Sequence, residues 1–317
     1  MIAPSAMALS DESERILSEV FPPEYVDSLR RRQGDHARRL LDILTSGLPL
    51  PSDDEKRWHA QFRVAERSEL AACLSAAKRC GLLDGDLLGR LRDRHSSQHR
   101  SALAEARACR FFNEARGLSL QPRPQGRGGK VLDFGATLTS QNILVEVKAP
   151  YVPVPESGSW SGDDAGVLQE CLEEANTQFA EERANVLVIV PSLRTPLYAH
   201  RLQLVKAFIG RPVMNLTIDV STGQAIGDVS PGFVRSGRFV ALYPDGAGEP
   251  RRRFTRVSAV LTIEPWRQLD DHAVRVDYDV LVVHNPFGQV RLEPGFFGDV
   301  PELVPKGSHM EWTDRVA

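Results

Sequence analysis

The feature that most constrains the fold of this chain is a continuous apolar run from Val186 to Val190. A strand with one face in water alternates apolar and polar residues, whereas a short run without alternation is typical of a strand covered on both faces. Segments with helical spacing stand on either side of the run, from about Ala165 to Arg183 and from about Leu197 to Ile209. We therefore expect an α/β protein with a central sheet between helices.

Composition excludes several classes of protein. The chain has 317 residues, of which 42% are hydrophobic and 26% charged, so it is neither a disordered segment nor a collagen-like or coiled-coil fibre. No apolar run approaches the roughly 20 residues of a membrane helix, and the first residues lack a basic segment followed by an apolar one. We expect a cytoplasmic protein without a membrane partner. Its four cysteines form no CxxC pair, which favours buried reduced thiols over a zinc site.

Two regions differ in their hydrophobic spacing. Residues 1–95 have apolar residues three and four positions apart, which predicts an all-helical N-terminal region. Residues 96–317 begin with a helix from Ser97 to about Arg116, with Gly117 as its C-cap, and then change to the spacing of strands. Strands are expected at 118–121, 130–138, 142–149, 213–220, 238–243, 256–263 and 274–284. The second region is thus expected to be an α/β domain with additional C-terminal strands.

Three residues on the second and third predicted strands carry the chemistry. Side chains alternate along a strand, so Glu146 and Lys148 lie on one face while the flanking valines lie on the other. If the two strands pair as a hairpin, Asp133 brings its carboxylate near Glu146. Two carboxylates held close together repel each other unless a cation lies between them, and hard oxygen ligands suit Mg²⁺ or Mn²⁺.

The use of basic residues adds to this. The chain has six lysines and 33 arginines, so a lysine beside an acid is more informative than usual. The formal net charge of −3 argues against a surface that binds nucleic acid throughout, although it leaves room for a local basic groove. Arg251, Arg252 and Arg253 form one such basic segment. They are either contacts with a nucleic-acid backbone or part of a solubilising loop.

The segment VLDFGATLTSQNILVEVKAP, residues 131–150, resembles the motif of the PD-(D/E)xK nuclease superfamily, the fold of restriction endonucleases. The resemblance spans about residues 97–200. It implies a restriction-endonuclease-like mixed central sheet flanked by helices, with Asp133 and Glu146 as metal ligands and Lys148 as the catalytic lysine.

Two further residues fit supporting roles in that family. The helix before the motif often contributes a glutamate, for which Glu105 is favoured over Glu114, and a polar residue of the following helix often faces the site, for which Gln178 is the candidate. The sequence departs from the family where Leu132 replaces the proline that usually precedes the first acid. This residue takes no part in the chemistry, so its replacement weakens the resemblance more than the expected activity.

The resemblance implies a metal-dependent nuclease that hydrolyses phosphodiester bonds, with DNA as the expected substrate and Mg²⁺ or Mn²⁺ as the cofactor. A metal lowers the pKa of a water and neutralises phosphate charge, while Lys148 orients or activates the attacking water. A homodimer would suit cleavage of both strands of a duplex. Two alternatives stay open: an inactive module of the same fold that binds nucleic acid or a protein partner, and an unrelated α/β scaffold whose three residues form a surface salt bridge worth at most about 1 kcal/mol.

Overall fold

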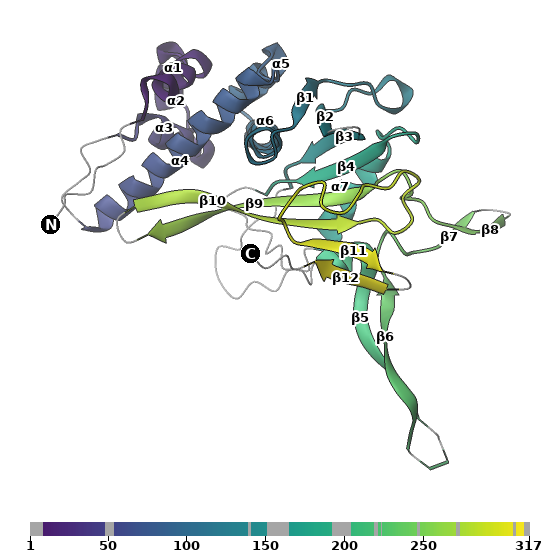
Figure 1. Ribbon diagram of the computed structural model, residues 1–317. Helices are drawn as coiled ribbons and strands as arrows, with labels where there is room; N and C mark the ends of the chain where they lie inside the picture. Colours follow the sequence, from purple (N-terminus) through teal and green to yellow (C-terminus); the bar gives the residue numbers. More distant parts are fainter. Residues whose placement is uncertain are drawn as a thin grey trace.

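The computed structural model describes residues 9–47, 54–138, 141–150, 165–191, 204–218, 221–222, 224–245, 248–270, 273–306 and 309–313. At its centre is an eight-stranded sheet in the order β1-β2-β3-β4-β9-β10-β11-β12 (Figure 1). These strands are β1 (Ser119–Pro122), β2 (Phe134–Leu138), β3 (Gln141–Lys148), β4 (Ala184–Ile189), β9 (Ala259–Asp270), β10 (Ala273–His284), β11 (Glu302–Lys306) and β12 (His309–Thr313). The predicted α/β class with a mixed sheet is confirmed.

The sheet combines parallel and antiparallel pairs. Strand β3 runs antiparallel to β2 and parallel to β4, and β4 runs parallel to β9. The remaining pairs are antiparallel, except that β10 and β11 are parallel. The hairpin of β2 and β3 therefore lies beside a short parallel block, and the residues at the carboxyl end of β3 lie at the same sheet edge as the carboxyl end of β4.

The apolar run forms the buried strand β4, as expected. All six of its residues are buried, and the five hydrophobic ones alternate between two hydrophobic clusters. Val186 and Val188 pack on one face of the sheet together with helix α6 (Ser96–Arg110), while Leu187 and Ile189 pack on the other face with helix α7 (Ala165–Asn176). Because both faces are covered by hydrophobic residues, the strand has no alternating polar side chains. Its one polar residue, Asn185, donates from its side-chain amide to the carbonyls of Ala180, Arg183 and Arg256.

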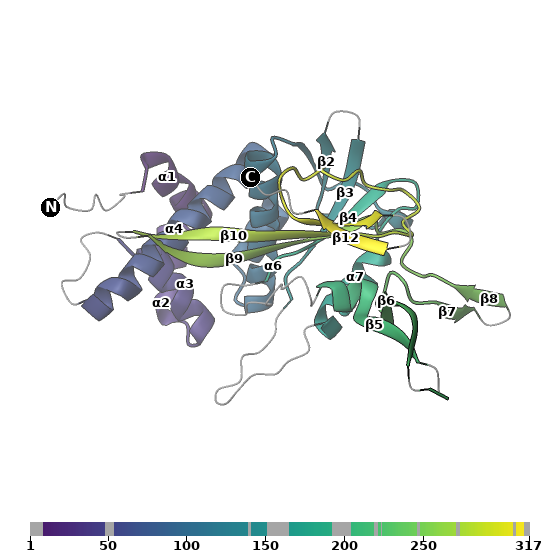
Figure 2. The same cartoon turned by 60° about the horizontal axis from the view of Figure 1, so that its bottom comes forward.

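The N-terminal region is helical, as predicted, and it packs against the sheet. Its helices are α1 (Asp11–Val20), α2 (Pro23–Arg31), α3 (Asp35–Thr45), α4 (Asp54–Arg79) and α5 (Gly85–Leu91). One hydrophobic cluster includes buried residues of these helices, of α6 and of the sheet. Figure 2 shows β9 and β10 reaching across to α4, which β10 contacts. The division of the chain at residue 95 stays a prediction.

A buried polar network lies where α4, α6 and β10 meet. The guanidinium Nε of Arg107 donates to Glu69 Oε1 over 2.8 Å, and both side chains are almost fully buried. The hydroxyl of Tyr278 and the thiol of Cys73 also donate to this carboxylate. The pair of Glu69 and Arg107 therefore joins α4 to α6, and the Tyr278 hydroxyl joins this network to β10.

Several predicted elements need correction. The helix expected to run to Arg183 ends at Asn176, and the strand expected from residue 130 begins only at Phe134, because residues 127–129 form a short 3₁₀ turn with Gly128 and Gly129 at positive φ. Helix α6 continues through a π-helical turn, Phe111–Ala115, to Gly117 at φ 63°, which confirms the predicted C-cap. The turn residues 139–140 and most of the helix expected at 197–209 lie outside the described residues.

The strand predicted at 238–243 is wrong. Residues 237–240 form a turn instead, in which Phe239 N–H donates to the carbonyl of Phe208 over 2.9 Å. Gly237 makes this turn possible, since a Cβ there would lie 2.3 Å from the carbonyl carbon of Phe208. Further strands are β5 (Gly210–Ile218), β6 (Ala225–Ser236), β7 (Tyr243–Asp245) and β8 (Gly248–Arg251), and β5 with β6 forms a ribbon that projects from the body (Figure 1).

The cysteines are free thiols, as expected, and only Cys80 is partly exposed. In the part of the chain that the structure describes, no helix combines the length and the apolar character needed to cross a membrane.

Candidate active site

The hairpin of β2 and β3 brings Asp133 beside β3. Phe134 pairs with Val145, so Asp133 stands at the start of β2 and level with Glu146. The Asp133 carboxylate oxygen Oδ2 accepts a hydrogen bond of 2.7 Å from the backbone N–H of Val147. The other oxygen, Oδ1, lies 3.5 Å from Arg123 Nη1. The pairing expected from the sequence therefore does bring the first acid to the strand that carries Glu146 and Lys148.

Glu146 and Lys148 lie on the face of the sheet that α7 covers. The ammonium Nζ of Lys148 is 3.0 Å from Glu146 Oε1 and 3.3 Å from Glu174 Oε2 on α7. The side-chain amide of Gln178 donates to the same Glu146 Oε1 over 2.9 Å. Among the described residues, Glu146 Oε2 has no hydrogen-bond partner. One oxygen of this buried carboxylate is thus held in place by two donors and the other is left for a further ligand.

Gln178 reaches Glu146 from a turn rather than from a helix. Its backbone carbonyl accepts from the Arg127 N–H over 2.7 Å, and this close approach depends on Gly126, where a Cβ would lie 2.4 Å from the Gln178 carbonyl oxygen. Lys130 Nζ also donates to the neighbouring Thr177 hydroxyl over 3.2 Å. The glycine-rich segment at residues 126–129 is therefore the support of Gln178.

Glu105 lies close to Asp133 but is already paired. Arg90 contacts both of its carboxylate oxygens, with Nη2 at 2.7 Å from Oε2, and Arg123 Nη1 lies 3.3 Å from Oε2. The same Arg123 nitrogen is 3.5 Å from Asp133 Oδ1. Glu114, by contrast, pairs with Arg79 and Arg110 on the helix surface. Of the two glutamates considered, Glu105 is the one that the structure brings to the site.

Arg123 occupies an unusual position. Its φ of 49° is the only positive value at a residue other than glycine in the described part of the chain. Its guanidinium also lies 3.2 Å from Asp84 and 3.3 Å from Asp86, so it faces four carboxylates at once. Nothing in the sequence singled out Arg90, Arg123 or Glu174, because none of them belongs to the motif and only the fold brings them to it.

The electrostatics of the cluster favour an added cation. Burial and the neighbouring carboxylates of Glu105 and Glu146 raise the pKa of Asp133 well above its usual range. Burial raises the pKa of Glu146 as well, although Lys148 and Gln178 oppose that shift. For Lys148, burial lowers the pKa, but the charges of Glu146 and Glu174 outweigh burial and the pKa is raised. Lys148 is therefore an ammonium, suited to orienting a group or stabilising negative charge.

Asp133 and Glu146 fit a magnesium ion. Mg²⁺ usually binds through one or two carboxylates, keeps several waters and takes further oxygens from a substrate phosphate. Of the four carboxylate oxygens of Asp133 and Glu146, Asp133 Oδ1 and Glu146 Oε2 are the two that form no short hydrogen bond with the described residues. No group of three or more His, Cys, Asp or Glu residues suited to a metal occurs in the described part of the chain. Glu105 is already paired with Arg90 and Arg123.

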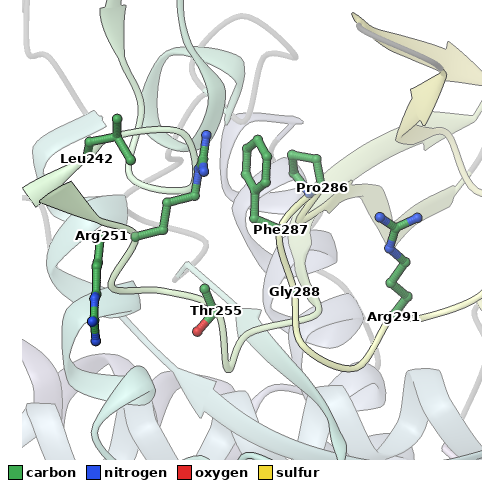
Figure 3. A pocket seen from close by; sticks show the side chains of 8 residues that line it. Leu242, Arg251, Thr255, Pro286, Phe287, Gly288 and Arg291 are labelled. Atoms are coloured by element: carbon green, nitrogen blue, oxygen red, sulfur yellow. The ribbon is translucent and has the colours of Figure 1, made fainter. Parts of the chain in front are cut away.

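Arg251, Arg252 and Arg253 lie away from this cluster. Arg251 and Arg252 line an open pocket with Leu242, Thr255, Phe287 and Arg291 (Figure 3). The guanidinium of Arg253 lies over the ring of Tyr243, 4.6 Å from its centroid. The three arginines therefore belong to a second region of the surface.

The fold and the cluster define an α/β protein with a buried carboxylate pair, a lysine and an amide at the end of a sheet hairpin. Comparisons of this chain with protein-family models, with curated proteins and with solved structures found no match.

Proposed function

We propose that this protein is a metal-dependent nuclease that hydrolyses phosphodiester bonds in nucleic acid, with DNA as its substrate, on a restriction-endonuclease-like fold. The observation that supports this most is the geometry of the cluster: Glu146 Oε1 accepts from Gln178 and lies 3.0 Å from Lys148 Nζ, and Asp133 accepts from the Val147 N–H of the same strand. Burial and the carboxylates of Glu105 and Glu146 also raise the pKa of Asp133, and shifted pKa values are typical of functional sites.

Each residue has a role in this proposal. Asp133 and Glu146 would hold Mg²⁺ or Mn²⁺ through Oδ1 and Oε2. The bound ion supplies charge neutralisation at the phosphodiester and a water of lowered pKa. Lys148 stands 3.0 Å from Glu146 and, as an ammonium, orients the attacking water and stabilises negative charge that develops on the phosphate. Gln178 holds the side chain of Glu146 in place through its hydrogen bond. Glu105 is paired with Arg90 and Arg123, and through Arg123 it helps to hold the side chains around Asp133 in place.

The test is cleavage of plasmid DNA, linear single-stranded DNA and RNA in the presence of Mg²⁺ or Mn²⁺. The variants are Asp133→Asn, which can still accept the Val147 hydrogen bond, and Lys148→Met, which keeps the length of the side chain. Lys306→Met is the matched control, because Lys306 forms a similar pair with Glu311 on the β11–β12 hairpin outside the site. We expect a loss of about 100-fold or more in both site variants and none in the control.

Two outcomes would contradict the proposal. Cleavage by Asp133→Asn at the wild-type rate would show that the activity belongs to another site. A wild type that cuts none of the substrates with either ion, yet binds nucleic acid more weakly as salt rises, would be the inactive binding module. The ion pairs of Glu105 with Arg90 and Arg123 favour that second function, because they already neutralise part of the cluster without a metal. Sedimentation of the wild type would test the expected homodimer.

A further inference from the structure

The pocket around Phe287 combines positive charge with exposed apolar surface. It has a volume of about 470 Å³, and its lining residues are Leu242, Arg251, Arg252, Thr255, Pro286, Phe287, Gly288 and Arg291. Figure 3 shows Phe287 between Arg251 and Arg291, with Thr255 at the floor. Phe287 is 37% exposed and Leu242 56% exposed. Three arginines and no acidic residue line this pocket, although the whole chain carries a net charge of −3.

Two of the pocket arginines lack an acidic partner. The guanidinium of Arg252 lies over the Phe287 ring, 3.6 Å from the centroid, and its Nε is buried without a hydrogen-bond partner. Among the described residues, neither Arg252 nor Arg291 forms an ion pair through its side chain. Neighbouring arginines do: Arg256 pairs with Glu181 and Arg238 with Glu173. The pocket thus holds positive charge against an aromatic ring and leaves it available to an anion.

We propose that this pocket is a subsite for one nucleotide of a single-stranded nucleic acid. The arginines would bind its phosphate, and the base would stack on the exposed part of the Phe287–Arg252 pair. Aromatic side chains and arginine guanidiniums both stack with bases of any sequence, and basic grooves bind the backbone. A base paired in a duplex keeps its faces stacked on its neighbours, so only an unpaired base can reach the ring of Phe287.

The pocket is joined to the candidate active site by the end of α7. The side-chain amide of Asn176 donates to the Arg253 carbonyl over 3.2 Å, and Arg256 Nη1 donates to the Asn176 carbonyl over 3.4 Å. Two residues further along the chain, Gln178 donates to Glu146. The segment that carries the pocket arginines and the turn that carries Gln178 therefore support each other. Binding of a nucleotide in the pocket does not depend on the proposed function. The further idea that the bound strand continues to the cluster of Asp133 and Glu146 does rest on the proposed function.

The test is fluorescence anisotropy of a labelled short oligothymidylate bound to the full chain in EDTA, where no metal-dependent cleavage takes place. The variants are Phe287→Ala and Arg252→Met. Trp266→Ala is the matched control, because Trp266 is an exposed aromatic residue on β9 outside the pocket. We expect Phe287→Ala to weaken binding roughly tenfold. Arg252→Met should weaken binding. It should also reduce the slope of log affinity against log salt concentration by about the amount that one phosphate contact contributes. The control should bind as the wild type does.

Three outcomes would overturn the subsite. The first is wild-type affinity in both Phe287→Ala and Arg252→Met, and the second is equal loss in Trp266→Ala. The third is competition by thymidine monophosphate as effective, per nucleotide, as the oligothymidylate, which would assign the pocket to a free nucleotide. Should Phe287→Ala unfold, Phe287→Leu keeps apolar bulk without the ring and is expected to lose the same stacking. Binding in EDTA needs no metal, so a failed nuclease assay with intact binding in the pocket is distinguishable from a failed subsite.

Discussion

At the scale of single residues, the buried carboxylate of Asp133 lowers the stability of the native state at neutral pH. Its carboxyl is buried next to Glu105 and Glu146, and burial together with these two charges raises its pKa well above the ordinary value of about 3.9. The native state thus binds a proton more tightly than the unfolded chain does. This tighter proton binding adds to the free energy of unfolding. The added stability is fully present below the ordinary pKa of the unfolded chain and is lost as the pH rises through the raised pKa of the native state.

Asp133→Asn should therefore raise the free energy of unfolding at neutral pH. The amide is uncharged, so it escapes the repulsion, and it still accepts from the Val147 N–H. The gain should disappear in acid below about pH 4, where the wild-type carboxyl is protonated in both states. Urea unfolding at several pH values measures both effects. Mg²⁺ should raise the Tm of the wild type and leave that of the variant unchanged, because only the wild type has both carboxylates.

Asp279→Asn is the control for this prediction, since Asp279 is an exposed residue of β10. Its stability should follow that of the wild type at every pH. A variant Asp133→Asn that is less stable than the wild type at neutral pH would contradict the cause that we assign, and would mean that the carboxylate is stabilised by Arg123 more than it is repelled by its neighbours.

At the scale of elements, the close contact between Gly126 and the turn after α7 holds the site together. A methyl group at residue 126 would lie 2.4 Å from the Gln178 carbonyl oxygen and 3.1 Å from Leu132, which is fully buried. Backbone cannot yield as a long side chain does, so Gly126→Ala must separate the two segments. The Arg127 N–H then loses its acceptor, and Gln178 moves away from Glu146.

We expect Gly126→Ala to cost about 1–3 kcal/mol of stability and to lower nuclease activity through Glu146. Gly89→Ala in α5 is the matched control, because no atom lies within 4 Å of the added methyl group. That substitution should be neutral or stabilise the protein by up to about 1 kcal/mol. Chemical denaturation compares the two variants. Equal stabilities would show that the contact between residue 126 and the turn is looser than described.

At the scale of the whole molecule, the N-terminal helices and the sheet share one hydrophobic cluster. Buried residues such as Leu74 on α4, Cys109 on α6 and Val282 on β10 belong to it. The ion pair of Glu69 and Arg107 crosses the same boundary and is almost fully buried. A fragment that begins at residue 96 would expose the apolar face of α6 to water and would lack Glu69, the ion-pair partner of Arg107.

The full chain should therefore unfold in a single cooperative transition. The fragment 96–317 should bind a hydrophobic dye and lack the sharp transition of the intact protein. Calorimetry and dye fluorescence test this. A fragment with a native near-ultraviolet spectrum and its own cooperative transition would show that the division predicted at residue 95 separates two independent domains.

The sequence by itself determined the local features of the fold, such as the type and burial of a strand or the end of a helix, because these depend on residues adjacent along the chain. The run from Val186 to Val190 specified a strand covered on both faces, the change of spacing after Gly117 marked the end of a helix, and alternation placed Glu146 and Lys148 on one face of β3. These follow from the periods of strands and helices, which depend only on backbone geometry.

Only the tertiary structure decided which distant groups surround those residues. Arg90, Arg123 and Glu174 come from three separate segments of the chain, and their interactions with Asp133 and Lys148 depend on distance and burial. The turn at 237–240, which was predicted as part of a strand, likewise depends on backbone contacts with residues about 30 positions earlier in the chain. Long-range contacts leave no periodic signal in a single sequence, because they depend on how the layers pack rather than on the spacing along the chain.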